Sequence, residues 1–104
     1  MAQTEYAVSV DAAAKGKMVK HVRFLARVSV AAAGRLRNAY YTALKSLEVN
    51  PQRCPLYKPK SSIGEELRYL LFSERYRIVF GVVGKAVFVY DIQDARQNVD
   101  KILI

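Results

Sequence analysis

The sequence holds 104 residues, of which 52% are hydrophobic and 25% are charged, and it contains one cysteine and one histidine. One cysteine excludes a disulfide within the chain, one cysteine and one histidine are too few for a zinc site, and the apolar runs are too short to cross a membrane. Seventeen Lys and Arg against nine Asp and Glu leave a net charge of +8, which favours an anionic partner over a basic surface that only water covers.

The first half of the chain predicts one strand followed by two helices. Residues 5–10 alternate in side-chain character, which is typical of a short strand. Asp11 stands at the N-cap position of a helix over residues 12–27, and Ser29 stands at that of a second helix over residues 30–48, which a proline stops. Each helix carries an apolar stripe at helical spacing, so we expect a helical hairpin that packs on a sheet.

The second half predicts a loop and three strands. Three prolines mark residues 51–64 as loop. Apolar runs then predict strands at residues 66–72, 76–83 and 86–92, and a short closing segment at 96–103. The order is β-α-α-β-β-β, which indicates one α+β domain over residues 1–104. Its helical hairpin packs on one face of a mainly antiparallel, four-stranded sheet.

Arginines interrupt these strands, and the side to which they point decides which face is charged. The alternate residues from Tyr76 to Val82 are all apolar and form the core face of their strand, so Arg77 points away from the helices. Because a buried, unpaired arginine is costly, we predict that Arg68 shares this open face, which puts Tyr69 on the core face. Arg96 lies just past the last strand and is expected to curl over the open face.

The candidate site is a group of cations around this face. Guanidinium groups bind phosphate in a fixed fork geometry and stay charged at physiological pH. The candidate anion-binding or target-binding residues are Arg68, Arg77, Arg96 and the loop residues Lys58 and Lys60. The alternative is that Arg68 and Arg77 only pair with nearby glutamates. No metal site and no cofactor are expected.

Several short segments stand in a characteristic order along the chain. They are Tyr6-Ala7-Val8, Ala31-Ala32-Ala33 with Leu36, Leu47 with Asn50-Pro51, Gly64-Glu65-Glu66-Leu67-Arg68, Tyr76-Arg77-Ile78-Val79-Phe80, and Val87-Phe88-Val89 through Arg96. Their order and spacing resemble the RelE/ParE superfamily of bacterial toxins over nearly the whole chain. The resemblance implies the toxin of a type II toxin–antitoxin (plasmid stabilisation) pair, made beside a small acidic antitoxin that wraps and silences it.

The superfamily holds two activities, and this sequence matches them unequally. By resemblance, RelE-like members cut mRNA on the ribosome with a basic cluster and a proton-handling tyrosine or histidine near the C-terminus, whereas ParE-like members inhibit DNA gyrase. Arg77 and Arg96 match the pattern. Arg68 stands where RelE-like members favour lysine, Leu70 replaces a second lysine, and no tyrosine or histidine follows Arg96. Residues 94–98 more closely resemble the ParE-like closing motif, although an aspartate replaces its usual histidine.

Cleavage of RNA needs a group that moves protons, and the sequence offers no evident one. A positioned acid or base contributes about 10²–10⁴-fold, and arginine, whose pKa exceeds about 12, serves poorly. His21 is expected on the surface of the first helix. Asp91 and Asp94 near Arg96 are candidate bases, although Asp94 more simply pairs with Arg75 or Lys85.

We therefore expect a ParE-like toxin that binds DNA gyrase or a similar target. The alternatives are a RelE-like, ribosome-dependent endoribonuclease with Arg68, Arg77 and Arg96 as catalytic candidates, and a non-toxic basic binding protein that keeps the fold. Cys54 is expected to be an inert or mildly reactive thiol and not a catalytic one, since the only histidine lies far away in sequence. The first residues lack the basic and apolar regions of a signal peptide, so we expect a cytoplasmic protein with no membrane partner.

Overall fold

The computed structural model describes residues 5–57 and 66–95. Its elements are β1 (Ala7–Val10), α1 (Ala12–Ala26), α2 (Val30–Ser46), the 3-10 turn η1 (Pro51–Arg53), β2 (Leu56–Tyr57), β3 (Leu67–Phe72), β4 (Tyr76–Val83) and β5 (Ala86–Asp94). The predicted α+β class, with two helices packed on one sheet, is confirmed, whereas the predicted order lacks η1 and β2, which lie between α2 and β3. The predicted number of four strands is wrong, because β2 lies inside the predicted loop and adds a fifth. The predicted closing segment 96–103 lies outside the described residues.

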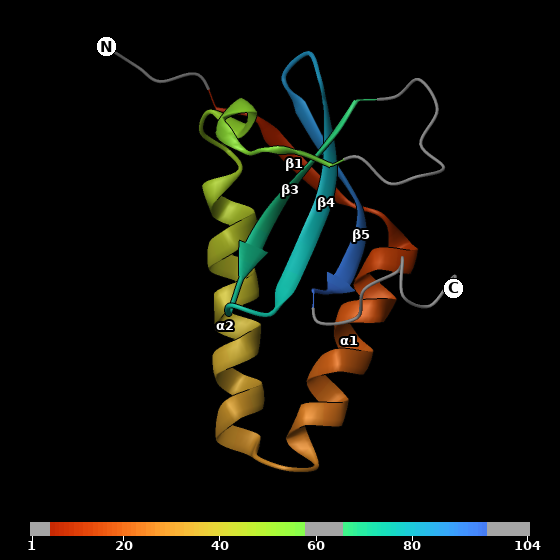
Figure 1. The fold of residues 1–104 in the computed structure, drawn as a ribbon, viewed down its shortest axis with the longest axis vertical. Helices are drawn as coiled ribbons and strands as arrows, with labels where there is room; N and C mark the ends of the chain where they lie inside the picture. Colours follow the sequence, from red (N-terminus) through yellow and green to blue (C-terminus); the bar gives the residue numbers. More distant parts are fainter. Residues whose placement is uncertain (1–4, 58–65, 96–104) are drawn as a thin grey trace.

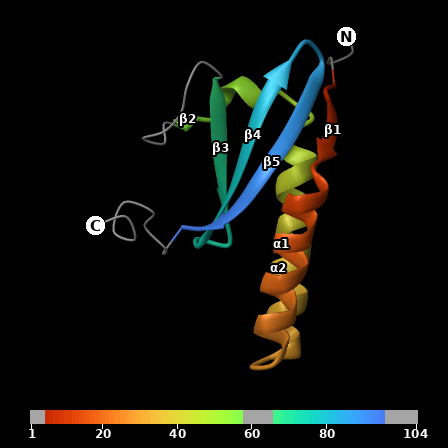
Figure 2. The ribbon, with the colours of Figure 1, turned by 90° about the vertical axis from the view of Figure 1, so that its right-hand side faces the viewer.

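The sheet is mixed, and its first and last strands are neighbours. The strand order is β1-β5-β4-β3-β2. β1 runs parallel to β5, and every other neighbouring pair is antiparallel. Both helices cover one face of the sheet and extend past one end of it, whereas no described helix covers the other face (Figures 1 and 2). We call this uncovered side the open face.

Side chains just outside the helices fix where each helix begins. The Asp11 carboxylate accepts a hydrogen bond from the backbone N–H of Ala13 at 3.0 Å, and the Ser29 hydroxyl accepts one from that of Ala32 at 3.0 Å. Both bonds satisfy amide groups that the first turn of a helix leaves without partners. The two predicted N-caps are confirmed, and with them the helical hairpin.

The core lies between the helices and the side of the sheet that faces them. Ile78 and Phe80 of β4 are buried there, together with Val87, Val89 and Ile92 of β5. These side chains pack against the apolar stripes of both helices. Burial of each such side chain stabilises the fold by about 1.5–3 kcal/mol. The predicted core face of β4 is therefore confirmed.

One extra residue in β5 changes which of its side chains face the helices. The register pairs Phe80 with Val89 and Val79 with Asp91, so two consecutive residues of β4 oppose β5 residues that are two positions apart. The extra residue of this β-bulge is Tyr90. A bulge shifts the alternation of the strand that carries it. Asp91 consequently points to the open face with Val79.

Candidate functional site on the open sheet face

The structure separates two arginines that the sequence predicts to lie together. β3 and β4 pair Arg68 with Phe80. Paired residues point to the same side of a sheet, so Arg68 lies on the helix-side face, and the prediction that it shares the open face with Arg77 is wrong. The physical reason is that Arg68 finds acceptors there. Its Nη1 donates to the carbonyl oxygens of Gln52 at 3.1 Å and Cys54 at 2.7 Å.

These two hydrogen bonds explain why Arg68 need not point to the open face. A buried guanidinium is costly only when it lacks partners. Arg68 is instead a structural tie that holds η1 against the start of β3, and it also lies 3.8 Å from the exposed Glu66 carboxylate. The alternative of pairing with a nearby glutamate thus describes Arg68 in part.

The change of face brings Tyr69 to the open side. Tyr69 pairs with Val79, whereas Leu70 and Phe72 pair with core residues of β4. The prediction that Tyr69 belongs to the core face is therefore wrong. β3 is apolar on both of its faces, so alternation alone does not decide its orientation, and a single arginine was the only guide.

Arg77 occupies the open face as predicted, and two tyrosine rings frame it. Its guanidinium carbon lies 5.5 Å from the centre of the Tyr69 ring and 5.9 Å from that of the Tyr57 ring. Such distances suit cation–π attraction. The Nε atom of Arg77 is buried without a hydrogen-bond partner. Within residues 5–57 and 66–95, Arg77 forms no ion pair, so it is a charged donor that lacks an acceptor.

A chain of hydrogen bonds crosses the open face beside Arg77. Lys17 of α1 forms an ion pair with Asp91, with 2.6 Å between Nζ and Oδ1. The Gln93 amide donates to Asp91 Oδ2 at 3.1 Å and to the Tyr57 hydroxyl at 3.0 Å. The two rings of the site also touch, because those of Tyr57 and Tyr69 meet edge to face at 6.4 Å. This series of hydrogen bonds connects α1 and β5 to β2, which lies at the opposite edge of the sheet from β1.

Aromatic and aliphatic side chains surround this site. A Cβ atom on Gly81 would lie only 3.2 Å from the Tyr90 ring, so the absence of a side chain at Gly81 gives that ring its place over β4. Leu71, Phe88 and Tyr90 are exposed. In the described strands, the open face carries one cation, Arg77, in a largely apolar setting.

The remaining predicted site residues do not join Arg77 within the described part of the chain. Lys58, Lys60 and Arg96 lie outside the described residues. Asp94, a candidate base, is paired with Arg75 at 3.2 Å between Nη2 and Oδ2, which confirms the simpler of its two predicted roles.

Burial shifts the pKa values of His21 and Cys54 in opposite directions. The His21 ring is half-buried on α1, with its centre 5.0 Å from that of Tyr76. Burial lowers the pKa of His21, the neighbouring Arg75 and Lys17 lower it further, and Asp94 opposes them. Burial raises the pKa of the Cys54 thiol against the opposing effect of Arg53 and Arg68. A protonated thiol is a poor nucleophile.

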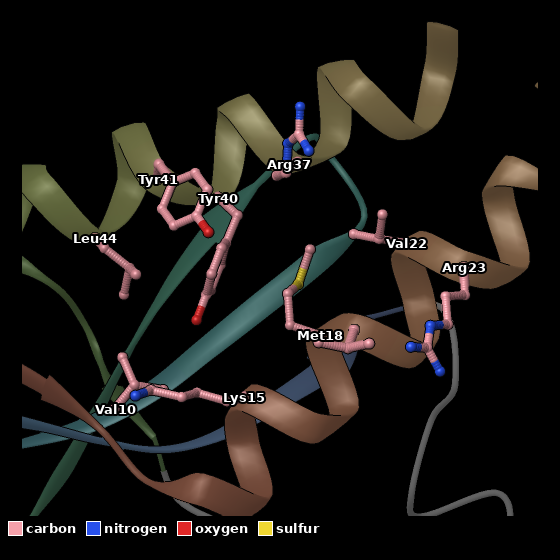
Figure 3. A pocket seen from close by; sticks show the side chains of 10 residues that line it. Val10, Lys15, Met18, Val22, Arg23, Arg37, Tyr40, Tyr41 and Leu44 are labelled. Carbon is pink, nitrogen blue, oxygen red and sulfur yellow. The ribbon is translucent and has the colours of Figure 1, made fainter. Parts of the chain in front are cut away.

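A second candidate surface is an apolar groove between the two helices, which we call the hairpin groove (Figure 3). It encloses about 440 Å³. Its apolar lining comprises Val10, Met18, Val19, Val22, Tyr40, Tyr41 and Leu44, and Lys15, Arg23 and Arg37 supply its cations. Residues 12–46, which form the hairpin, contain eight of the seventeen Lys and Arg and no Asp or Glu. The hairpin groove is thus apolar inside and cationic around.

Sequence reasoning missed Tyr57, Tyr69 and Gln93 as members of the site. A weak signal exists for Tyr57, since Leu56-Tyr57 is a short apolar pair within a polar, proline-rich loop. Gln93 carries no signal, because its side depends on the bulge at Tyr90. These three residues come together only through the pairing of β2, β3 and β5 around β4.

The described residues contain neither a cluster of metal-binding side chains nor a helix that could span a membrane. In that part of the chain, no group of three or more His, Cys, Asp or Glu side chains is placed to hold a metal ion. Neither α1 nor α2, nor any other described helix, has the length and apolarity needed to cross a membrane. Models of known protein families give no match to this chain, and curated proteins give none either.

Proposed function

We propose that this protein is the toxin component of a type II toxin–antitoxin module and that its open face binds DNA gyrase or a similar target. Two features support this proposal. The helical hairpin and the antiparallel run of β3, β4 and β5 agree with the fold that the sequence resemblance implies. The observation that carries it is Arg77, a partly buried cation that has no ion-pair partner in the described residues and stands between two tyrosines.

The composition of the open face favours a protein target. Tyrosine and arginine dominate the energetically important positions of protein–protein interfaces. Tyr57, Tyr69, Tyr90 and Arg77 lie on this face, with Leu71 exposed among them. A nucleic-acid surface instead needs several cations that track the phosphates. The described strands supply only one there, so binding to gyrase without chemistry remains the first proposal.

A RelE-like endoribonuclease is the second candidate, and the position of Tyr69 favours it. The sequence offered no acid or base near Arg77, whereas the Tyr69 ring lies 5.5 Å from the Arg77 guanidinium. A phenol moves protons in acid–base catalysis, and an arginine stabilises the negative charge that develops at a phosphate. Tyr69 and Arg77 together supply part of the set that cleavage of mRNA by 2′-hydroxyl attack requires.

The hairpin groove is the proposed site of the antitoxin. Its apolar interior suits one face of an amphipathic helix. The eight cations of residues 12–46, with no acidic residue among them, suit Asp and Glu beside that face. An acidic segment that folds on binding meets both conditions. The same charges disfavour a second copy of this chain, because two hairpins would bring like charges together.

Induced expression in a bacterial host tests the proposed function. We expect growth arrest and a DNA-damage response with intact transcripts, and inhibition of supercoiling by purified gyrase. Arg77→Gln should relieve all three, because loss of an interface arginine costs about 2 kcal/mol, roughly thirtyfold in affinity. Arg35→Ala, an exposed arginine on α2, is the matched control.

The same experiment separates the other two candidates. Transcripts cut within codons on the ribosome, with no DNA damage, would replace gyrase by mRNA as the target, and Tyr69→Phe should then abolish cleavage. Normal growth in the presence of folded protein would overturn the toxin proposal and leave a non-toxic basic binding protein.

A further inference from the structure

In the described strands, the open face holds one carboxylate, Asp91, close to one cation, Arg77, and the two do not pair. Among the described strand residues on this face, only Asp91 is acidic. Arg77 pairs with Gln93 and Val79 pairs with Asp91, so Arg77 and Asp91 are diagonal neighbours on one face. Diagonal neighbours lie about 7–8 Å apart, which long side chains span. Arg77 has the length to reach Asp91, and a pair between them would neutralise the site.

Other groups occupy the Asp91 carboxylate instead. Its Oδ1 accepts from Lys17 Nζ at 2.6 Å and from the backbone N–H of Ile92 at 3.0 Å. Its Oδ2 accepts from the Gln93 amide at 3.1 Å. Each oxygen therefore has a donor, and no donor comes from Arg77.

The fold explains why Lys17 reaches this carboxylate from the helix side. β1 covers β5 only from Ala86 to Val89, so the edge of β5 beyond Val89 is not paired with β1. α1 follows β1 directly and packs along β5. Its Lys17 side chain spans this uncovered edge and meets Asp91 where that residue turns to the open face.

We infer that Lys17 is a positioning residue for Arg77, although the two do not touch. Lys17 holds Asp91 away from Arg77, and Arg77 therefore keeps its positive charge available for an anionic group of the target. This inference rests on the proposed function for its biological consequence, since it concerns the same open face. It assigns a role at that face to a residue of α1, outside the sheet.

The pair of Lys17 and Asp91 itself adds little to the stability of the fold. The Lys17 side chain is 53% exposed and that of Asp91 27%, and exposed pairs stabilise proteins weakly. A pair between Asp91 and the partly buried Arg77 would be a charge-assisted contact that the target must break. Removal of Lys17 should therefore weaken target binding about tenfold or more while the fold stays intact.

The decisive test compares Lys17→Met with the double variant Lys17→Met/Asp91→Asn. Methionine keeps the apolar stem and removes the ammonium group. Gyrase binding and growth inhibition should fall about tenfold in Lys17→Met and recover in the double variant, where residue 91 has no charge to offer Arg77. Lys20→Met, an exposed lysine on the same helix, removes the same net charge and should behave as the unaltered protein. A double variant as weak as Lys17→Met would show that the ion pair is only structural and would overturn the inference.

A measurement without any target separates this inference from the proposed function. In ¹⁵N-labelled protein, the Arg77 Nε–H resonance should shift and exchange more slowly in Lys17→Met, because Asp91 then accepts from Arg77. It should keep its original position in Lys20→Met and in the double variant. An unchanged resonance in Lys17→Met would overturn the inference even if the protein proves to be a toxin. A shifted resonance in a protein that does not arrest growth would support it while the proposed function fails.

Discussion

The two faces of this protein differ in how they carry charge. The helical hairpin holds eight cations and no acidic residue, yet its hairpin groove is apolar. The open face has one cation in the described strands, and that cation is partly buried between Tyr57 and Tyr69. The net charge of +8 therefore reports mainly on the helices, whereas the candidate target site depends on one guanidinium in an aromatic setting. The net charge of this protein therefore does not indicate where the candidate target site lies.

The largest expected effect comes from truncating Phe80 in the core between the sheet and the helices. Phe80 is fully buried between the sheet and the helices, so Phe80→Ala should lower the free energy of unfolding by about 3–5 kcal/mol. Phe88→Ala, on the exposed side of β5, should change it by about 0.5 kcal/mol or less. Urea unfolding measures both. Equal losses in the two variants would contradict the placement of the core on the helix side of the sheet.

A second substitution tests the separation of the two arginines. Arg68→Met leaves the carbonyl oxygens of Gln52 and Cys54 without their donor and should cost about 1–2 kcal/mol of stability. Arg77→Met removes a group whose Nε has no partner and should leave the free energy of unfolding nearly unchanged. Target binding should show the reverse order. The assignment of faces is wrong if Arg68→Met impairs binding while stability is kept.

The third prediction separates the two binding surfaces. Tyr41 is 60% exposed at the hairpin groove, so Tyr41→Glu should keep the fold and repel an acidic antitoxin segment, with a loss of about tenfold in affinity. Thr42→Glu, next to it and outside the groove lining, is the control with the same charge change. Isothermal titration with the proposed antitoxin, an acidic protein that we expect from the neighbouring reading frame, measures the affinity. A similar loss in Arg77→Gln would place the antitoxin on the open face instead.

The smallest expected effect is a pH dependence on the helix side. Burial lowers the pKa of His21 from 6.5 in the folded protein, so the unfolded chain binds this proton more readily. His21 should therefore leave the free energy of unfolding unaffected above pH 6.5. It should lower that free energy as the pH drops through 6.5 toward the lower pKa of the folded state. The variant His21→Gln should lose this slope. Denaturation curves above and below pH 6.5 check it, and a slope that persists in the variant would assign it to other groups.

The sequence predicts the elements whose signals are local. Asp11 and Ser29 cap the helices as expected, since a cap depends on only a few neighbouring residues. The core face of β4 follows from the apolar residues that stand at every second position from Tyr76 to Val82. Arg77 was placed correctly for the same reason. In these segments one pattern is strong enough to decide the outcome.

The features that sequence reasoning missed depend on contacts distant in the chain. The orientation of β3 fits the acceptors that Gln52 and Cys54, in and just after η1, offer to Arg68. The sequence of residues 67–72 gives no sign of these acceptors. The open-face position of Asp91 follows from the bulge at Tyr90, which shifts the alternation by one residue. Tyr57 belongs to a two-residue strand that is too short to leave a periodic signal. The site around Arg77 is thus a product of tertiary structure.

The pairing of β1 with β5 has a consequence for how the protein forms during synthesis. Ala7 lies beside Ala86, so the strand made first finds its neighbour only after most of the chain has left the ribosome. Long-range parallel pairing is slow to form because a large loop must close first. The sheet that carries Arg77 on its open face therefore lacks one of its five strands until then, so the proposed target site is completed late in synthesis.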